Sequence, residues 1–246
     1  MSKFGSEKRY ADVLTVLLVI VIIGIVGLLG YFGYKAITRN KVENDAADAT
    51  QQFYNNIGSS SDDEEEENTN TNYEGVGLEN FNTTTPEPDS NSSSSTSGRK
   101  RTYLGDYEVK GTIRIPKTGI EYPILEKATV GSLAMSVGIL TIVTCDSITT
   151  PVEELNVLGT NAFILGHNYR NGQFFSDNDQ LEIGDEILVT DYTGQTITYN
   201  IYNMYYTTSD DVTFLDRELD PNTREITLQT CNDDSSQRLI IWARDN

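Results

Sequence analysis

An uninterrupted apolar stretch near the N-terminus constrains this chain more than any other feature. Residues 13–34 read VLTVLLVIVIIGIVGLLGYFGY and contain no charged side chain. As an α-helix these 22 residues would be about 33 Å long, enough to cross a hydrocarbon core of roughly 30 Å. A cleaved signal peptide is the alternative, but its apolar region spans only about 7–15 residues. We therefore predict an uncleaved transmembrane anchor.

The residues after this anchor are acidic and poor in apolar side chains. Residues 43–98 carry thirteen Asp and Glu and no Lys or Arg, and they include SSDDEEEENTNTN and TTTPEPDSNSSSSTSG. Such a segment buries too little apolar surface to offset the entropy lost on ordering. We therefore predict a disordered acidic and Ser-rich linker over residues 35–102. The formal net charge of the chain is −19, which disfavours nucleic acid as a partner because phosphate backbones would repel it.

Short β-type runs separated by turn residues fill the rest of the chain. They read EVKGTIRIP, SVGILTIVTC, NAFILGH, DEILVTDYTG, QTITYNIYNMYY, EITLQTC and RLIIWARDN. Many short strands with few helical patterns are typical of an antiparallel barrel or sandwich. We predict one all-β domain over residues 103–246.

Two cysteines, Cys145 and Cys231, are too few for a disulfide framework, although a single disulfide between them stays open. No spacing typical of zinc ligands occurs, so we predict no metal site and no cofactor. Cys145 ends an apolar run, where a cysteine is usually buried and inert. Cys231 ends a β-type run, precedes a polar turn and lies seven residues before Arg238. A partly exposed thiol near positive charge is the setting of a reactive cysteine.

His167 is the only histidine and follows the apolar run Phe163–Leu165 and Gly166. At the exit of a strand its side chain would point into a loop or an opening of the domain. By itself it could equally be a surface histidine without a role. Arg238 opens the last β-type run, and its guanidinium could bind a developing oxyanion or substrate carbonyls. The alternative for Arg238 is a salt bridge to Asp233 or Asp234.

These residues together resemble a known family. Thr227, Leu228, Thr230 and Cys231 match the Thr-Leu-x-Thr-Cys signature of the sortases, the membrane-anchored cysteine transpeptidases of Gram-positive bacteria, and LGHN lies upstream. The resemblance covers residues 109–244 and implies a closed eight-stranded sortase-type β-barrel with short helices, behind the anchor and the disordered linker. The spacing between histidine and cysteine is similar to that of classes A and D. It leaves little room for the long extra helix of class B, and no class C lid motif is found.

The resemblance also implies an activity, partners and a cellular location. Cys231 would cleave a Leu-Pro-x-Thr-Gly-like sorting signal at the Thr–Gly bond through a thioacyl enzyme, with His167 as acid and base, Arg238 stabilising the oxyanion and Thr230 contacting the substrate. The implied partners are secreted proteins with C-terminal sorting signals, a peptidoglycan precursor or other amine acceptor, and the membrane. The implied location is a single-pass membrane protein with residues 1–12 cytoplasmic and the catalytic domain extracellular. Calcium dependence stays open.

Three alternatives differ from this interpretation. Papain-like hydrolases place their cysteine before their histidine, which is the reverse of the order here. Caspases have the right order, but QTCND lacks the Ala and Gly that surround their cysteine. The non-enzymatic alternative is a tethered β-domain that only binds a wall component, and such a domain would tolerate the loss of Cys231.

Overall fold

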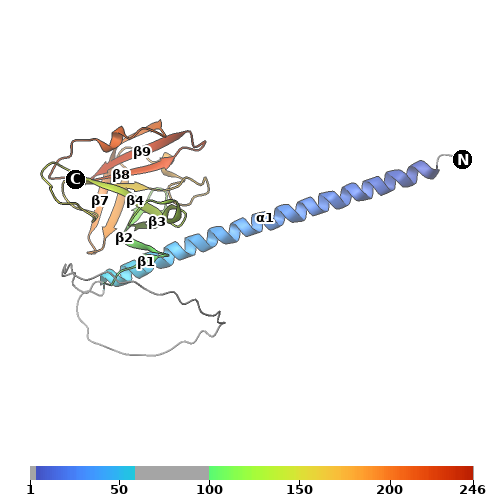
Figure 1. Cartoon of the computed structure of the whole chain (residues 1–246), viewed down its shortest axis with the longest axis horizontal. Helices are drawn as coiled ribbons and strands as arrows, with labels where there is room; N and C mark the ends of the chain where they lie inside the picture. The colour runs from blue at the N-terminus through green and yellow to red at the C-terminus, as the bar shows by residue number, and fades with distance from the viewer. Residues whose placement is uncertain (1–3, 59–99, 246) are drawn as a thin grey trace, which may run out of the picture.

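The computed structural model describes residues 4–58 and 100–245. Within them a long N-terminal helix leads to a β-barrel that carries only short helices (Figure 1). The elements are α1 (Phe4–Gly58), β1 (Tyr103–Leu104), β2 (Tyr107–Ile115), β3 (Ile120–Leu125), α2 (Val130–Leu133), β4 (Val137–Thr144), β5 (Thr160–Leu165), η1 (Asn178–Gln180), β6 (Glu186–Asp191), β7 (Thr196–Thr208), η2 (Thr213–Leu215), β8 (Arg224–Cys231) and β9 (Gln237–Arg244).

Eight strands close the barrel. The strand order is β1-β2-β3-β4-β5-β8-β9-β7-β6, and an additional pairing of β2 with β6 joins the two ends of the sheet. The two-residue β1 pairs only with β2 and lies outside the closed ring. Closure leaves no exposed edge along the ring, which removes a surface prone to pairing with other chains. The predicted closed eight-stranded barrel is confirmed.

Two strand pairs in this ring are parallel, β3 with β4 and β5 with β8, and the others are antiparallel. The parallel pair β5 and β8 matters for the site, because the carboxyl ends of parallel neighbours meet at the same end of the barrel. β8 then continues through a tight turn into β9, which runs back beside it. The residues that follow β5 and those that end β8 are therefore neighbours in space.

Alternation along the strands divides side chains between an inner and an outer face. Along β8, residues Ile226, Leu228 and Thr230 lie opposite Ala243, Ile241 and Leu239 of β9, and all six are buried. A second cluster, made by Phe163, Ile240 and Phe214, lies on the other face. There Phe214, from the η2 turn between β7 and β8, packs on Phe163 with ring centroids 5.9 Å apart. The β7–β8 connection thus covers part of the outer face beside the end of β8.

The first half of α1 carries the predicted anchor. Residues 14–34 form a continuous apolar helix with exposed side chains, long and apolar enough to cross a membrane. Figure 1 shows this part of α1 projecting away from the barrel toward the N-terminus. Its exposed leucine, isoleucine and valine side chains are not covered by any other described part of the chain, so a lipid phase is the environment in which they would be buried.

The helix does not end at Tyr34, and the predicted disordered linker is wrong for residues 35–58. α1 continues without a break to Gly58, and one stripe of this continuation packs against the barrel. The stripe consists of the buried Ala46, Ala49 and Phe53 and the partly buried Val42 and Ile57. Its steps of three and four residues are the repeat of an amphipathic helix, and the acidic residues between them obscured that repeat in the sequence. The rest of the predicted linker, residues 59–99, lies outside the described residues.

Candidate active site

The register of β5 and β8 brings His167 and Cys231 to the same end of the barrel. Leu165, the last residue of β5, is paired with Gln229 of β8, and the backbone N–H of Gly166 donates to the carbonyl of Gln229 at 3.1 Å. Two residues further along the chain lie His167, which follows β5, and Cys231, which ends β8. Because neighbouring strands are about 4.8 Å apart, this register brings two segments that are 64 positions apart in the sequence to the same end of the barrel.

Gly166 is required by the close packing at this point. A Cβ on residue 166 would lie 2.5 Å from the ring of Phe175, a separation that real Cβ atoms do not tolerate. The backbone N–H of Phe175 also donates to the carbonyl of His167 at 3.1 Å. The segment that carries the histidine is therefore held between β8 and its own returning loop.

Cys231 and Arg238 face each other across the β8–β9 hairpin. Cys231 ends β8, Arg238 is the second residue of β9, and their Cα atoms are register partners. Side chains directly opposite in an antiparallel pair lie on the same face, with Cβ atoms roughly 4.5–5.5 Å apart. The hairpin thus places Arg238 and Cys231, both partly exposed, on the same face of the sheet.

No carboxylate among the described residues lies within ion-pair distance of Arg238. Its Nη1 instead donates to the carbonyls of Ser235 at 3.4 Å and Gln237 at 3.3 Å. Asp233 accepts from Asn168, and Asp234 accepts from the backbone N–H of Ser236. The alternative of a surface salt bridge is therefore not realised in the described part of the chain. The long bonds of Arg238 to its own turn leave its remaining donors available to a bound anion or carbonyl.

His167 sits in a partly apolar environment. Its ring stacks on that of Tyr169 with centroids 4.9 Å apart, and Tyr169 packs on the buried Phe174 at 5.7 Å. Burial lowers the pKa of His167 below the ordinary value of 6.5, because an apolar surrounding disfavours the charged imidazolium. At neutral pH the imidazole is therefore mainly neutral and able to accept a proton.

Asn168 connects the loop after β5 that carries His167 (the histidine loop) to the turn that joins β8 to β9 after Cys231 (the cysteine turn). The sequence did not reveal this role. Its Nδ2 donates to the carbonyl of Cys231 at 3.1 Å and to Oδ1 of Asp233 at 3.2 Å. Nearby, Nη2 of Arg170 donates to Oγ of Ser235 at 3.2 Å. The only signal in the sequence was the position of Asn168 directly after the histidine in LGHN. Its partners lie more than 60 residues away in the sequence, so no local pattern identifies them.

Thr230, the predicted substrate contact, lies on the opposite face of β8 from Cys231. It is 4% exposed, pairs with Leu239 on the inner face, and its hydroxyl has no hydrogen-bond partner among the described residues. Cys231 and Arg238 share one face of the β8–β9 pair, and His167 follows the end of the neighbouring β5, whereas Thr230 lies on the other face.

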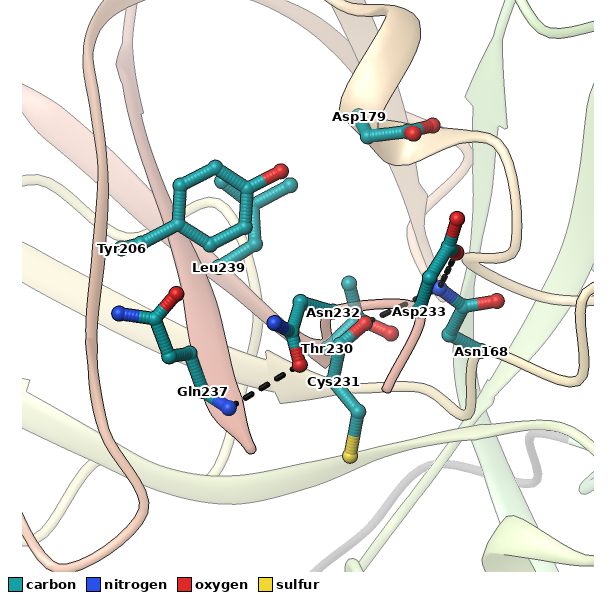
Figure 2. A pocket seen from close by; sticks show the side chains of 9 residues that line it. All are labelled: Asn168, Asp179, Tyr206, Thr230, Cys231, Asn232, Asp233, Gln237 and Leu239. Atoms are coloured by element: carbon teal, nitrogen blue, oxygen red, sulfur yellow. Dashed lines mark hydrogen bonds between the residues drawn. The ribbon is translucent and has the colours of Figure 1, made fainter. Parts of the chain in front are cut away.

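A polar hollow of about 210 Å³ opens at the end of the barrel beside the cysteine turn. Figure 2 shows its lining, with the sulfur of Cys231 directed away from Tyr206 and Leu239. The residues lining it are Asn168, Asp179, Tyr206, Thr230, Cys231, Asn232, Asp233, Gln237 and Leu239. Its two charged members are acidic, so the hollow adds negative charge on the side of the strand end away from the thiol.

Cys145 occupies a different environment from Cys231. It is 8% exposed, directly follows β4, and its Sγ lies 2.8 Å from Oγ of Ser147. Both cysteines are free, so the disulfide left open by the sequence is absent from the structure. Of the two, only Cys231 has a basic residue as its register partner, and His167 follows the end of the strand that neighbours β8.

The connection between β7 and β8 is held firmly over the outer face. Arg217 lies over the ring of Trp242, with its Cζ 3.9 Å from the centroid, and its Nη1 is 2.9 Å from Oε2 of Glu225. A stacked guanidinium paired with a largely buried carboxylate is more than a surface charge pair. The β7–β8 connection is therefore anchored to both β8 and β9.

Comparison with known proteins identifies the family to which the β-barrel domain belongs. Residues 113–246, more than half of the chain, match the model of the sortase domain. No curated protein matches the chain. Sortase A from Corynebacterium diphtheriae, in a lid mutant, is 26% identical over 57% of this chain and 72% of its own, with a TM-score of 0.47. A Clostridium perfringens sortase D5 transpeptidase is 27% identical over 56% and 79%, with a TM-score of 0.45. C. perfringens sortase C with the C-terminal cell wall sorting motif is 21% identical over 56% and 70%, also with a TM-score of 0.45.

Proposed function

Because the chain belongs to the sortase family of cysteine transpeptidases, we propose that it transfers secreted proteins from a C-terminal sorting signal to an amine of the cell wall. The observation that supports this proposal is the register of β5, β8 and β9, in which Leu165 pairs with Gln229 and Cys231 pairs with Arg238. The proposed substrate is a Leu-Pro-x-Thr-Gly-like signal, cleaved between Thr and Gly. The proposed class is A- or D-like, and the β7–β8 connection supports it because its only helix is the three-residue η2.

The first half-reaction forms a thioacyl enzyme. Neutral His167 accepts the proton of the Cys231 thiol, and the sulfur attacks the carbonyl carbon of the Thr–Gly amide. Negative charge develops on the carbonyl oxygen, where the guanidinium of Arg238 stabilises it. As the C–N bond breaks, the protonated imidazole passes its proton to the leaving amine. The lowered pKa of His167 suits both steps, because the neutral ring is a ready base and its conjugate acid releases the proton readily.

The second half-reaction restores the enzyme. An incoming amine attacks the thioester carbon, His167 accepts the proton that the amine loses, and the C–S bond breaks to release Cys231 as the thiolate. The imidazolium then returns the proton to the sulfur. With the apolar half of α1 as a single-pass anchor and residues 1–12 in the cytoplasm, the barrel lies on the outer side of the membrane, where both substrates are present.

Mass spectrometry of trapped enzyme tests the reaction class. The full-length protein in detergent micelles, incubated without amine with peptides containing Leu-Pro-x-Thr-Gly, should gain the mass of the peptide up to Thr. Fragmentation should locate that mass on Cys231 and not on Cys145, which is buried against Ser147. Folded protein that acquires no acyl group from any peptide of a sorting-signal library would favour the tethered domain that only binds a wall component.

Arg238→Lys tests whether Arg238 stabilises the oxyanion through its planar fork of donors or only through its positive charge. Lysine keeps the positive charge but lacks the planar fork of donors, and the loss of one oxyanion donor costs roughly 10²–10³ in rate. We expect transpeptidation of a Leu-Pro-x-Thr-Gly peptide to fall by at least about tenfold, while the melting temperature hardly changes because Arg238 makes no ion pair among the described residues. Parental activity in the lysine variant would reduce Arg238 to a structural residue.

A further inference from the structure

The second half of α1 is docked on the barrel by a continuous interface. Ala46, Ala49 and Phe53 are each no more than 3% exposed and belong to the same apolar cluster as the barrel core. Further along the helix, the hydroxyl of Tyr54 donates to Oε1 of Glu121 at 2.9 Å and lies 2.9 Å from Oγ1 of Thr112. Figure 1 shows this part of α1 passing beneath β1, β2 and β3. The second half of α1 and the barrel therefore form one packed unit.

Two contacts join the helix to the loop that carries His167. The hydroxyl of Tyr122, on β3, donates to Oε1 of Glu43 at 2.8 Å, and its ring packs on Phe174 with centroids 5.0 Å apart. Nε2 of Gln173, in the same loop, reaches the backbone carbonyl of Arg39 at 3.5 Å. The helix thus touches the histidine loop directly and also through a strand.

An aromatic series continues this contact to the histidine itself. From Phe174 the series passes to Tyr169 at 5.7 Å and from Tyr169 to His167 at 4.9 Å. The loop between these residues needs such support, because its backbone is unusual. Arg170 and Phe174 have φ values of 55° and 52°, a conformation that costs a side-chain-bearing residue energy and persists only when its surroundings enforce it.

From this arrangement we propose that the extramembrane part of α1, residues 39–57, is a positioning element of the active site, which holds His167 in place through Tyr122, Phe174 and Tyr169. None of these residues touches the reacting atoms. Their action is to fix the ring of His167 relative to Cys231, so that proton transfer occurs at the required distance. The proposal rests on the proposed role of His167 as acid and base.

The arrangement has a consequence for the substrate. Only 11 residues separate the last apolar residue of the anchor, Tyr34, from the first fully buried contact, Ala46, a helical rise of about 18 Å. A continuous helix keeps that separation, whereas a flexible linker would not. The proposed substrate would therefore meet a barrel held at a fixed distance from the membrane-spanning half of α1.

Two glutamate substitutions at adjacent alanines, one buried and one exposed, test the positioning role of α1 in the full-length protein. Ala46→Glu forces a carboxylate into a site that is 1% exposed, which should lift the helix from the barrel because an unpaired buried charge is costly. Ala47→Glu adds the same side chain one position away, on the exposed face. We expect Ala46→Glu to reduce kcat about 10- to 100-fold with little change in KM, and Ala47→Glu to behave as the parent.

The single histidine supplies a readout that does not depend on activity. With ¹³C-labelled histidine in an untagged protein, one imidazole resonance reports on His167. In Ala46→Glu this resonance should shift, and its pKa should rise toward the ordinary value of 6.5 because the ring loses its packing. A folded Ala46→Glu protein with a parental His167 resonance, pKa and kcat would overturn the proposal, as would a loss of kcat with the resonance unmoved.

Milder variants apply if Ala46→Glu does not fold. Glu43→Ala removes the acceptor of the Tyr122 hydroxyl, whereas Glu43→Gln keeps an oxygen there. We expect the His167 resonance to move in the alanine variant and to be restored in the glutamine variant. Equal resonances in both would refute the coupling. An inactive parent protein would instead contradict the proposed function, and the resonance would still show whether the helix controls the histidine.

Discussion

Replacing Cys231 with alanine should abolish transpeptidation, with a fall of at least about 10⁴-fold in kcat/KM. Removal of the nucleophile from a catalytic group that acts as a unit costs about as much as removal of the whole group. No other thiol can replace it, because Cys145 is buried at the end of β4. The measurement is the rate at which full-length protein joins a Leu-Pro-x-Thr-Gly peptide to a glycine-based amine, followed by chromatography.

Cys145→Ala is the matched control for this experiment. It removes the other thiol, so the rate should stay within about twofold of the parent if Cys231 is the only nucleophile. Cys231→Ala should also melt at nearly the parental temperature, because a partly exposed side chain contributes little packing. A Cys231→Ala protein that retains turnover while Cys145→Ala loses it would exchange the roles of the two cysteines.

The strands of the barrel were predictable from the sequence because their signals are local. Strand alternation such as Ile197, Tyr199 and Ile201 appears within a few residues, and turn residues mark the boundaries. Closure through the β2–β6 pairing joins segments about 75 residues apart, and it came only from the resemblance to a family. A choice between barrel and sandwich depends on such distant pairings, which periodicity cannot supply.

The continuation of α1 past Tyr34 was not predicted from the sequence, because the acidic composition indicates a linker whereas the spacing of the apolar residues indicates a helix. Residues 43–58 share the acidity of the segment after them, and a reading by composition groups the two together. Yet Ala46, Ala49 and Phe53 repeat at helical spacing, and helix propensity is high for alanine. Since small alanines bury little surface, the stripe gives a weak hydrophobic signal until the barrel face opposite it is known.

The site was predictable where it coincides with a motif and not where it depends on geometry. His167, Cys231 and Arg238 follow from the signature and the order of the strands. Asn168 and Tyr169 are recognised only through contacts with the cysteine turn and with the histidine ring. The opposite placement of Thr230 and Cys231 is itself a local rule, because adjacent strand residues face opposite sides. Applied to TLQTC, that rule places Thr230 and Cys231 on opposite faces of the strand.

His167→Ala should reduce turnover by roughly 10²–10⁴-fold, the usual worth of general acid–base catalysis. In the parent the neutral imidazole starts the reaction, so kcat/KM should rise with pH through a pKa below 6.5. In His167→Ala that acidic limb should disappear, because no second histidine exists in the chain. The measurement is the pH profile of kcat/KM between about pH 5 and 8 for both proteins, a range that brackets the ordinary histidine pKa of about 6.5.

Stability against pH gives an independent control on the same residue. Folding lowers the pKa of His167, so the unfolded chain binds more protons than the folded one as the pH falls below about 6.5. The folded barrel should therefore lose stability from that pH downward until the folded pKa is passed, and His167→Ala should lose this part of the dependence. If the alanine variant keeps near-parental turnover and the acidic limb persists, the proton transfers are carried out by another group. In that case the neutral imidazole beside Cys231 is only a packing partner of Tyr169.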